Sequence, residues 1–212
     1  MKKWICSSWL IILMVLISCQ PQVVFDTPQP ADISALSEFP KKLEGKYLSS
    51  LDNSILRISP RSLIRYYNFD MKIHISQLDS SQQLIGDTLF DLNTNTGKFI
   101  KLEGDSIVQH VNETDTIFTI DSLNVLKKFK GYYFINTRTS PTTWQVQKLD
   151  LTRGILTLSS INNKEDIEQL KSLTETPQDT TPYVFSPSRK EFKAFIKNEG
   201  FRNKEVFSKI GE

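Results

Sequence analysis

The sequence predicts a mainly β protein, built as an antiparallel meander or barrel-like sheet with two short C-terminal helices. Three observations carry this prediction. Apolar and polar residues alternate in several segments between about residues 41 and 161, which is the period of a strand with one buried face. Turn-forming residues separate these segments at short intervals. Only after residue 161 do apolar residues recur at helical spacing.

The segment FDMKIHIS shows the strand pattern most clearly. Its apolar residues are Phe69, Met71, Ile73 and Ile75, and polar residues stand between them. This alternation predicts a half-buried antiparallel strand with its apolar side on the core. DTIFTID, GYYFINTRT, TTWQVQKLDL and GILTLSSI have similar patterns, so we expect each to form a further strand.

Turn signals recur between these strands. They are found at Asp52-Asn53, from Asn93 to Gly97, at Gly104-Asp105, at Gly131 and at Arg153-Gly154. Glycine, asparagine and aspartate favour the backbone conformations of tight turns. Short connections of this kind join antiparallel neighbours, which is why we expect a meander.

The first predicted helix covers about residues 163–174. Asn162 or Asn163 can cap its N-terminus, and Glu165 and Asp166 place negative charge in the first turn. Apolar residues then follow at helical spacing.

The second predicted helix covers about residues 188–199. Ser188 and Glu191 have the spacing of a capping box, and Gly200 stands where a helix would end. We expect both helices to cover an open edge or end of the sheet, because exposed edges promote aggregation.

The N-terminus has the layout of an export signal. Lys2 and Lys3 precede an apolar stretch from Trp4 to Ile17. This stretch is shorter than the about 20 apolar residues that a membrane-spanning helix needs, and it fits a secretory signal peptide. The signal ends in LISC, Leu16 to Cys19, which resembles the lipobox of bacterial lipoproteins. That resemblance implies cleavage before Cys19, attachment of a lipid to its sulfur and acylation of the new amino terminus.

These features predict the domain organisation and the location. Residues 1–18 form the lipoprotein signal peptide, residues 19–39 the lipidated cysteine and a flexible proline-rich tether, and residues 40–212 a single β-rich domain. We expect the lipid on Cys19 to anchor the protein to a membrane. No acidic cluster follows Cys19, which favours the periplasmic face of the outer membrane over display on the cell surface.

Charge and cysteine content limit the possible functions. The chain has 26 basic and 24 acidic residues, and removal of a leader containing Lys2 and Lys3 leaves a neutral chain. Nothing here predicts nucleic-acid binding. Cys6 leaves with the signal peptide and the sulfur of Cys19 is blocked, so we expect no disulfide and no thiolate metal site.

No pattern indicates catalysis, a cofactor or a metal. His74 lies on the polar side of its strand without a second ligand at metal spacing, and His110 is the other histidine of the chain. DLNTNTG, from Asp91 to Gly97, differs from a calcium loop in its glycine position and lacks a glutamate at position 12; we interpret it as a hairpin turn. No G-x-S-x-G elbow is present. We therefore expect a non-enzymatic protein with no catalytic residues.

Four short triplets are similar to an O-glycosylation acceptor used by some envelope bacteria, and they equally fit strands that begin after a turn. They are Asp87-Thr88-Leu89, Asp105-Ser106-Ile107, Asp115-Thr116-Ile117 and Asp121-Ser122-Leu123.

Two resemblances bear on function. Gly45-Lys46-Tyr47 is similar to the G-x-W signature of lipocalins, with tyrosine in place of tryptophan, and implies a closed barrel around a small apolar ligand. The whole layout, with the lipobox, LEGKY and PSRKEFKAFIKNEGF, resembles uncharacterised Gram-negative lipoproteins without a known activity. We expect an interaction module that binds an envelope protein; the alternative is a lipocalin-like carrier of a small apolar ligand.

Overall fold

The computed structural model describes residues 23–174 and 181–211, in sixteen strands and two α-helices. The helices are α1 (Lys164–Thr174) and α2 (Arg189–Lys197). The strands are β1 (Val23–Phe25), β2 (Ala35–Leu36), β3 (Gly45–Ser49), β4 (Ile55–Ile58), β5 (Ser62–His74), β6 (Gln82–Ile85), β7 (Thr88–Asp91), β8 (Thr96–Phe99), β9 (Lys101–Glu103), β10 (Ser106–Thr119), β11 (Val125–Phe129), β12 (Tyr132–Ser140), β13 (Thr143–Thr152), β14 (Ile155–Ser160), β15 (Tyr183–Phe185) and β16 (Asn203–Ile210). The predicted fold class is confirmed.

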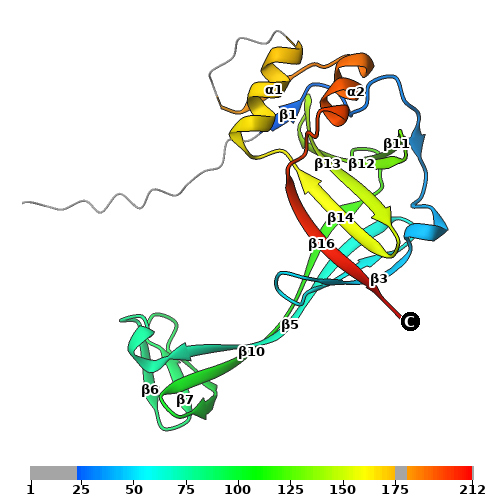
Figure 1. Cartoon of the computed structure of the whole chain (residues 1–212). Coiled ribbons are helices and arrows are strands. Elements are labelled where there is room, and N and C mark those ends of the chain that lie inside the picture. Colours follow the sequence, from blue (N-terminus) through cyan, green and yellow to red (C-terminus); the bar gives the residue numbers. More distant parts are fainter. Residues whose placement is uncertain (1–22, 175–180, 212) are drawn as a thin grey trace, which may run out of the picture.

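Most strands belong to one strongly curved sheet. Its order is β2-β11-β12-β13-β14-β16-β3-β4-β5-β10-β9, with β1 paired to β13 and β15. All of these pairs are antiparallel except β1 with β15. The sheet does not close into a barrel, because its end strands β2 and β9 are not paired with each other (Figure 1). The closed barrel implied by the lipocalin resemblance is therefore absent.

The concave side of the sheet encloses the first core. Tyr47, the residue at the tryptophan position of the lipocalin signature, is fully buried there and donates a hydrogen bond from its hydroxyl to the Leu43 carbonyl at 2.8 Å. Other aromatic and aliphatic side chains fill the space around it, among them Phe39, Leu56, Leu63, Phe118, Tyr133, Leu149, Leu156 and Phe207. Side chains thus occupy the interior in which a carrier would hold its ligand.

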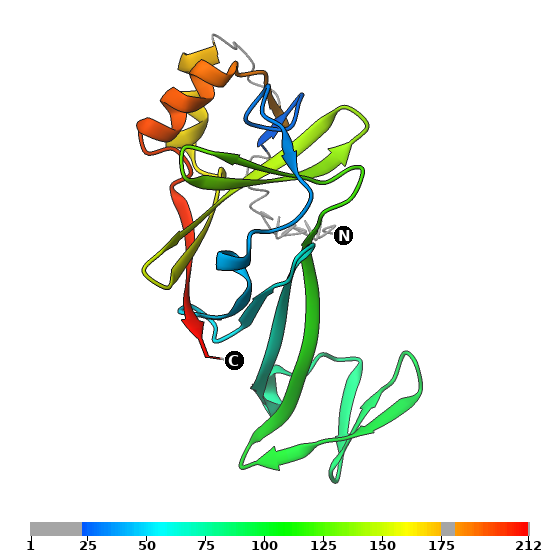
Figure 2. The same ribbon diagram turned by 90° about the vertical axis from the view of Figure 1, so that its right-hand side faces the viewer.

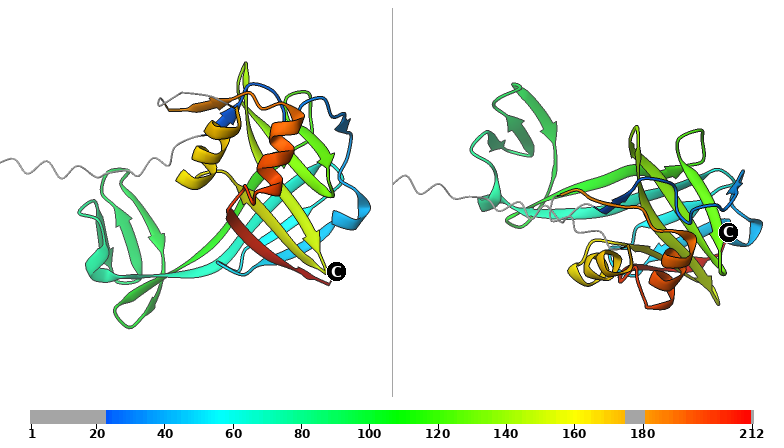
Figure 3. Two further views of the ribbon diagram at one scale, coloured as in Figure 1. Left: turned by 45° about the horizontal axis from the view of Figure 1, so that its top comes forward. Right: turned by 90° about the horizontal axis from the view of Figure 1, so that it is seen from above.

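A second core lies on the opposite face of β12 and β13. Phe134 and Val146 point to this side and pack with Phe192, Phe195 and Leu170 of the two helices. The helices therefore cover a face of the sheet and not an open edge, as Figure 3 also shows. GYYFINTRT accordingly does not alternate in burial, since residues 133–136 are all buried. A strand whose two faces are both covered has a continuous run of apolar residues instead of an alternating pattern.

The N-terminal segment was predicted as a flexible tether over residues 19–39, and this is wrong for residues 23–39. Val23, Val24 and Phe25 are buried in β1, and Phe39 is buried in the first core. Strand β2 pairs with β11. Proline prevents long regular elements, but it does not prevent short strands or burial between prolines.

Two polar side chains fasten this segment to the sheet. The buried Lys127 ammonium donates to the carbonyls of Pro28 at 2.7 Å and Pro30 at 2.8 Å. The Asn136 amide exchanges hydrogen bonds with the backbone of Gln29, accepting from its N–H and donating to its carbonyl. Burial lowers the pKa of Lys127, and the two carbonyls supply the partners that a buried ammonium needs.

The helix ends follow the sequence signals. Asn163, one of the two predicted caps, accepts a hydrogen bond from the Asp166 N–H at 2.8 Å. Ser188 and Glu191 form the predicted capping box. Asp166 itself is fully buried and accepts hydrogen bonds from the Arg202 N–H, at 2.9 Å, and from its guanidinium. This ion pair joins α1 to the start of β16.

Candidate interaction surface

Strands β5 and β10 leave the body as a long two-stranded arm. They pair from Ser62 with Thr119 out to His74 with Ser106. Near the body β5 also pairs with β4, but only as far as Tyr66. Beyond that point, until β9 joins β10 at Val108, each strand has only the other as a neighbour. Figures 1 and 2 show the arm projecting from the body with a small second sheet at its tip.

The predicted half-burial of the FDMKIHIS strand is wrong for the middle of the arm. Phe69 and Met71 share one side of β5, but they are 42% and 37% exposed. The alternation is real, yet no core covers the apolar side, because the strand has already left the body. A two-stranded ribbon that is open on both sides is marginally stable by itself in water. Exposed apolar residues on such a ribbon indicate a surface for a partner.

The tip continues this apolar surface. Strands β6, β7 and β8 form a separate three-stranded sheet, on or beside which Ile85, Leu92, Phe99 and Leu102 are exposed, Phe99 to 81%. Of the eleven large apolar residues that are exposed in the described parts of the chain, six lie between Phe69 and Leu102. Exposed apolar side chains are thus concentrated on the arm.

A cavity of about 500 Å³ lies between the tip sheet and the arm. Ile107, which is buried, and Val108 form part of its wall on β10. The rest of the lining is mixed. Its apolar residues are Ile73, Leu78, Leu89, Phe99 and Ile100, and its polar or charged residues are Gln82, Asp91, Thr96, Lys98, Lys101, Gln109 and His110. Its size is within the range of small-molecule sites.

One ion pair links β9 to β5, and a second lies within β9. The Glu103 carboxylate lies 2.6 Å from the Lys72 ammonium and 2.7 Å from the Lys101 ammonium. Hydrogen bonds and charge attraction from Lys101, and then from Lys72, lower the pKa of Glu103 to about 2. Both pairs are exposed, so each contributes little to stability.

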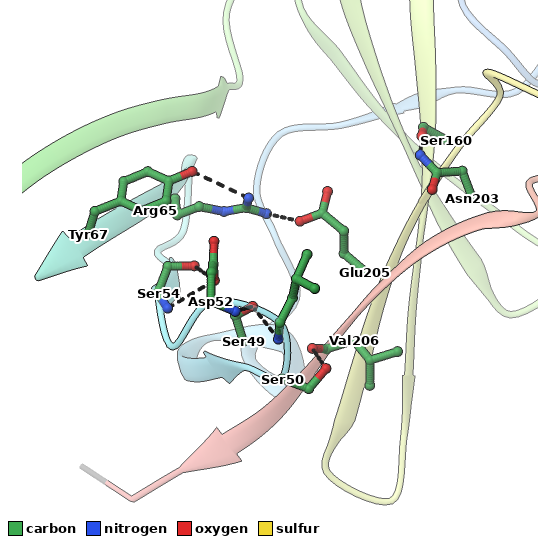
Figure 4. Close-up of polar contacts among 11 residues, drawn as sticks. Ser49, Ser50, Asp52, Ser54, Arg65, Tyr67, Ser160, Asn203, Glu205 and Val206 are labelled. Carbon is green, nitrogen blue, oxygen red and sulfur yellow. Dashed lines mark hydrogen bonds and ion pairs between the residues drawn. The ribbon is translucent and has the colours of Figure 1, made fainter. Parts of the chain in front are cut away.

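The root of the arm is fixed to the body by Arg65. Its guanidinium bonds to Glu205 of β16 and lies 3.5 Å from the Tyr67 hydroxyl (Figure 4). It also lies 5.3 Å from the centre of the Phe207 ring. Burial alone would lower the pKa of Arg65, but the bonds to Tyr67 and Glu205 outweigh it and raise that pKa. Because β3 and β4 separate β5 from β16 in the sheet, this contact crosses the concave side and links the root of the arm to the far strand β16.

The structure does not bring the two histidines together. The His74 ring contacts the Ser76 hydroxyl at 2.7 Å and caps a short 3-10 turn. His110 lies opposite Asp70 on the ribbon, 2.9 Å from its carboxylate, and both side chains are more than half exposed. Such an open pair differs from the enclosed acid–base pairs of hydrolases.

The DLNTNTG segment forms the β7–β8 hairpin, as predicted. The Asp91 carboxylate accepts hydrogen bonds from the N–H groups of Asn93 and Thr94, and Asn95 adopts a positive φ of 53°. The triplets at Asp87 and Asp105 lie where β7 and β10 begin, and the triplet at Asp121 lies in the turn between β10 and β11. The triplet Asp115-Thr116-Ile117 lies within β10 and follows no turn.

Cys19, the predicted lipidation site, lies outside the described residues, as does the signal peptide. Among residues 23–174 and 181–211, neither helix has the length and apolar character needed to cross a bilayer. No known protein family, curated protein or solved structure matches the chain.

Proposed function

We propose that the chain is a non-catalytic interaction module of the cell envelope, held by lipid on Cys19 at the periplasmic face of the outer membrane. Its arm presents an apolar surface to an envelope protein. The observation that supports this proposal is the concentration of exposed apolar side chains, including Phe69, Met71 and Phe99, on the outer part of the arm. This part, residues 69–111, contributes no residue to either core of the body.

The position of the arm suits this role. Strand β1, which begins at Val23, the first described residue, lies at the end of the molecule that is opposite the tip (Figures 1 and 2). Val23 follows Cys19 by four positions, a span of at most about 14 Å even when fully extended. A lipid on Cys19 would therefore keep the body close to the membrane and the tip away from it.

The test is a pull-down from solubilised envelopes with matched variants. Phe69→Ser with Met71→Ser should remove the captured partner, while Leu51→Ser, an 85% exposed residue on the body, should not. All of these side chains are exposed, so each variant is expected to unfold at the same temperature as the parent chain. Equal capture by every variant would contradict the proposal.

The carrier remains the second candidate, because of the cavity at the tip. That cavity has the size of a small-molecule site and an apolar wall that includes Ile73, Leu89 and Phe99, whereas side chains fill the interior of the main sheet. Native mass spectrometry of the chain and of Leu89→Trp, which fills the cavity, separates the two functions. An adduct of a few hundred daltons that Leu89→Trp loses would favour the carrier.

A further inference from the structure

The outer face of β3 and β4 places two cations side by side. Lys46 and Arg57 are direct partners in the ladder between these strands, and both are exposed. Like charges in this position destabilise a sheet. Within residues 23–174 and 181–211, neither side chain has an ion pair or a hydrogen bond to relieve the repulsion. A bound anion would relieve it.

A hollow of about 770 Å³ beside this pair adds further positive charge. Lys41 and Lys209 also line it, and Lys209 lies over Gly45, whose missing side chain leaves the space for it: a Cβ there would lie 3.0 Å from Cε of Lys209. Among the described residues that line the hollow, Glu44 is the one with a carboxylate, and it is paired with Lys41 at 3.3 Å. Cations gathered in a concave site attract oxyanions, and arginine is suited to holding them with two hydrogen bonds.

A second groove of about 370 Å³ continues from the same two cations toward the root of the arm. Three amides line it, those of Asn53, Asn68 and Asn112, together with Tyr66. Asn68 and Asn112 are direct partners across β5 and β10. None of these four side chains has a hydrogen bond to another part of the described chain. Amides both donate to and accept from hydroxyl groups, and the half-exposed Tyr66 ring offers a flat apolar side.

We propose that this face binds an anionic saccharide. Lys46 and Arg57 hold its oxyanion, and the sugar ring lies along Tyr66 with its hydroxyls on the asparagine amides. The ligand class is a sugar that carries phosphate, either free or as the headgroup of a glycolipid. This site is separate from the apolar surface of the arm and does not depend on the proposed function.

Calorimetric titration of the purified full chain in detergent tests the proposal, with glucose 6-phosphate, inorganic phosphate and glucose as probes. Glucose 6-phosphate should bind at least about tenfold more tightly than inorganic phosphate, and glucose should not bind. Lys46→Gln and Arg57→Gln should each weaken binding about tenfold or more, as the loss of a hydrogen bond to a charged group implies. Lys98→Gln, an exposed lysine at the tip, is the matched control and should change nothing. Asn68→Ala should reduce the preference for the sugar phosphate and leave inorganic phosphate unaffected.

Binding to vesicles distinguishes a glycolipid headgroup from a free sugar phosphate. Any lipid on the chain inserts equally into phosphatidylcholine vesicles with and without diphosphoryl lipid A, so a difference in binding between them reports the groove. If lipid A increases vesicle binding, Arg57→Gln removes the increase and free glucose 6-phosphate does not bind, the ligand is a glycolipid headgroup. If glucose 6-phosphate binds and lipid A makes no difference to vesicle binding, the ligand is a free sugar phosphate. Equal affinity for inorganic phosphate and glucose 6-phosphate would overturn the saccharide assignment. Binding by Lys46→Gln and Arg57→Gln at parental affinity, or no binding in either assay, would overturn the site.

Discussion

Excision of the arm should leave the body folded. In this variant Asn68 and Asn112, which are direct partners, are joined by Asn-Gly, the preferred two-residue hairpin turn. The cut removes residues 69–111, including β6, β7, β8, β9 and the outer parts of β5 and β10. Neither core of the body contains a residue from this stretch.

The expected change in stability follows from burial. Ile107 and Val108 are the only buried residues that the cut removes, and they contact the tip rather than the body. Surface changes away from a core alter the free energy of unfolding by roughly 0.5 kcal/mol, so we expect a change below about 1 kcal/mol. In a protein of this size that corresponds to a shift of about 2–4 °C in melting temperature.

The assay is thermal and urea unfolding followed by circular dichroism. Phe192→Ala is the matched control, because Phe192 is fully buried in the second core and its truncation should cost about 3–5 kcal/mol. A loss of stability on excision as large as that of Phe192→Ala would refute the reasoning, since it would show that arm and body form one cooperative unit.

Four further predictions concern single residues. Asp166→Ala removes the buried acceptor of the Arg202 guanidinium and N–H. The partly exposed guanidinium keeps its bonds to Gln169 and Asn198, so the loss should cost about 1–3 kcal/mol in urea unfolding; a cost as small as that of the exposed Glu165→Ala would contradict this. Lys127→Met removes both hydrogen bonds to the N-terminal segment and should cost about 1–3 kcal/mol and open that segment to protease; an unchanged digestion pattern would argue against its anchoring role. Gly200→Ala would place a Cβ 2.5 Å from the Phe195 ring and should cost about 1–3 kcal/mol, whereas Gly211→Ala, which meets nothing within 4 Å, should be neutral. In an NMR titration the carboxyl of Glu103 should have a pKa of about 2 rather than 4.5. Because this pKa is lowered in the folded chain, the ion pairs of Glu103 favour folding above about pH 4.5, and this contribution is lost as the pH falls through 2. A midpoint near 4.5 would show that the pairs do not form in solution.

Local signals in the sequence predicted the elements well. The capping box at Ser188 and Glu191 fixed the start of α2, and the turn at Arg153-Gly154 fixed the β13–β14 hairpin, because each depends on residues close together in the chain. Gly200 lies near the end of α2 as predicted, but for another reason. The positive φ belongs to Glu199 and Phe201, and Gly200 is required because the Phe195 ring leaves no room for a side chain.

The arrangement of the elements could not be predicted in the same way. Phe69 and Met71 alternate with polar residues, as apolar residues do in a strand that lies on a core. No nearby residue in the sequence shows that β5 no longer pairs with β4 at this point. Lys46 and Arg57 are eleven residues apart, and only the register of β3 and β4 places them together. The proline-containing segment at residues 23–39 looked like a tether because the side chains that hold it, Lys127 and Asn136, lie about a hundred residues away.

Site-specific photocrosslinking in intact cells tests the central claim most directly. A benzophenone amino acid at Met71 or Phe99, both exposed on the arm, is compared with one at Leu51, exposed on the body. The account predicts that Met71 and Phe99 yield the same crosslinked protein and that Leu51 does not. A protein captured from Leu51 but from neither arm position would contradict it.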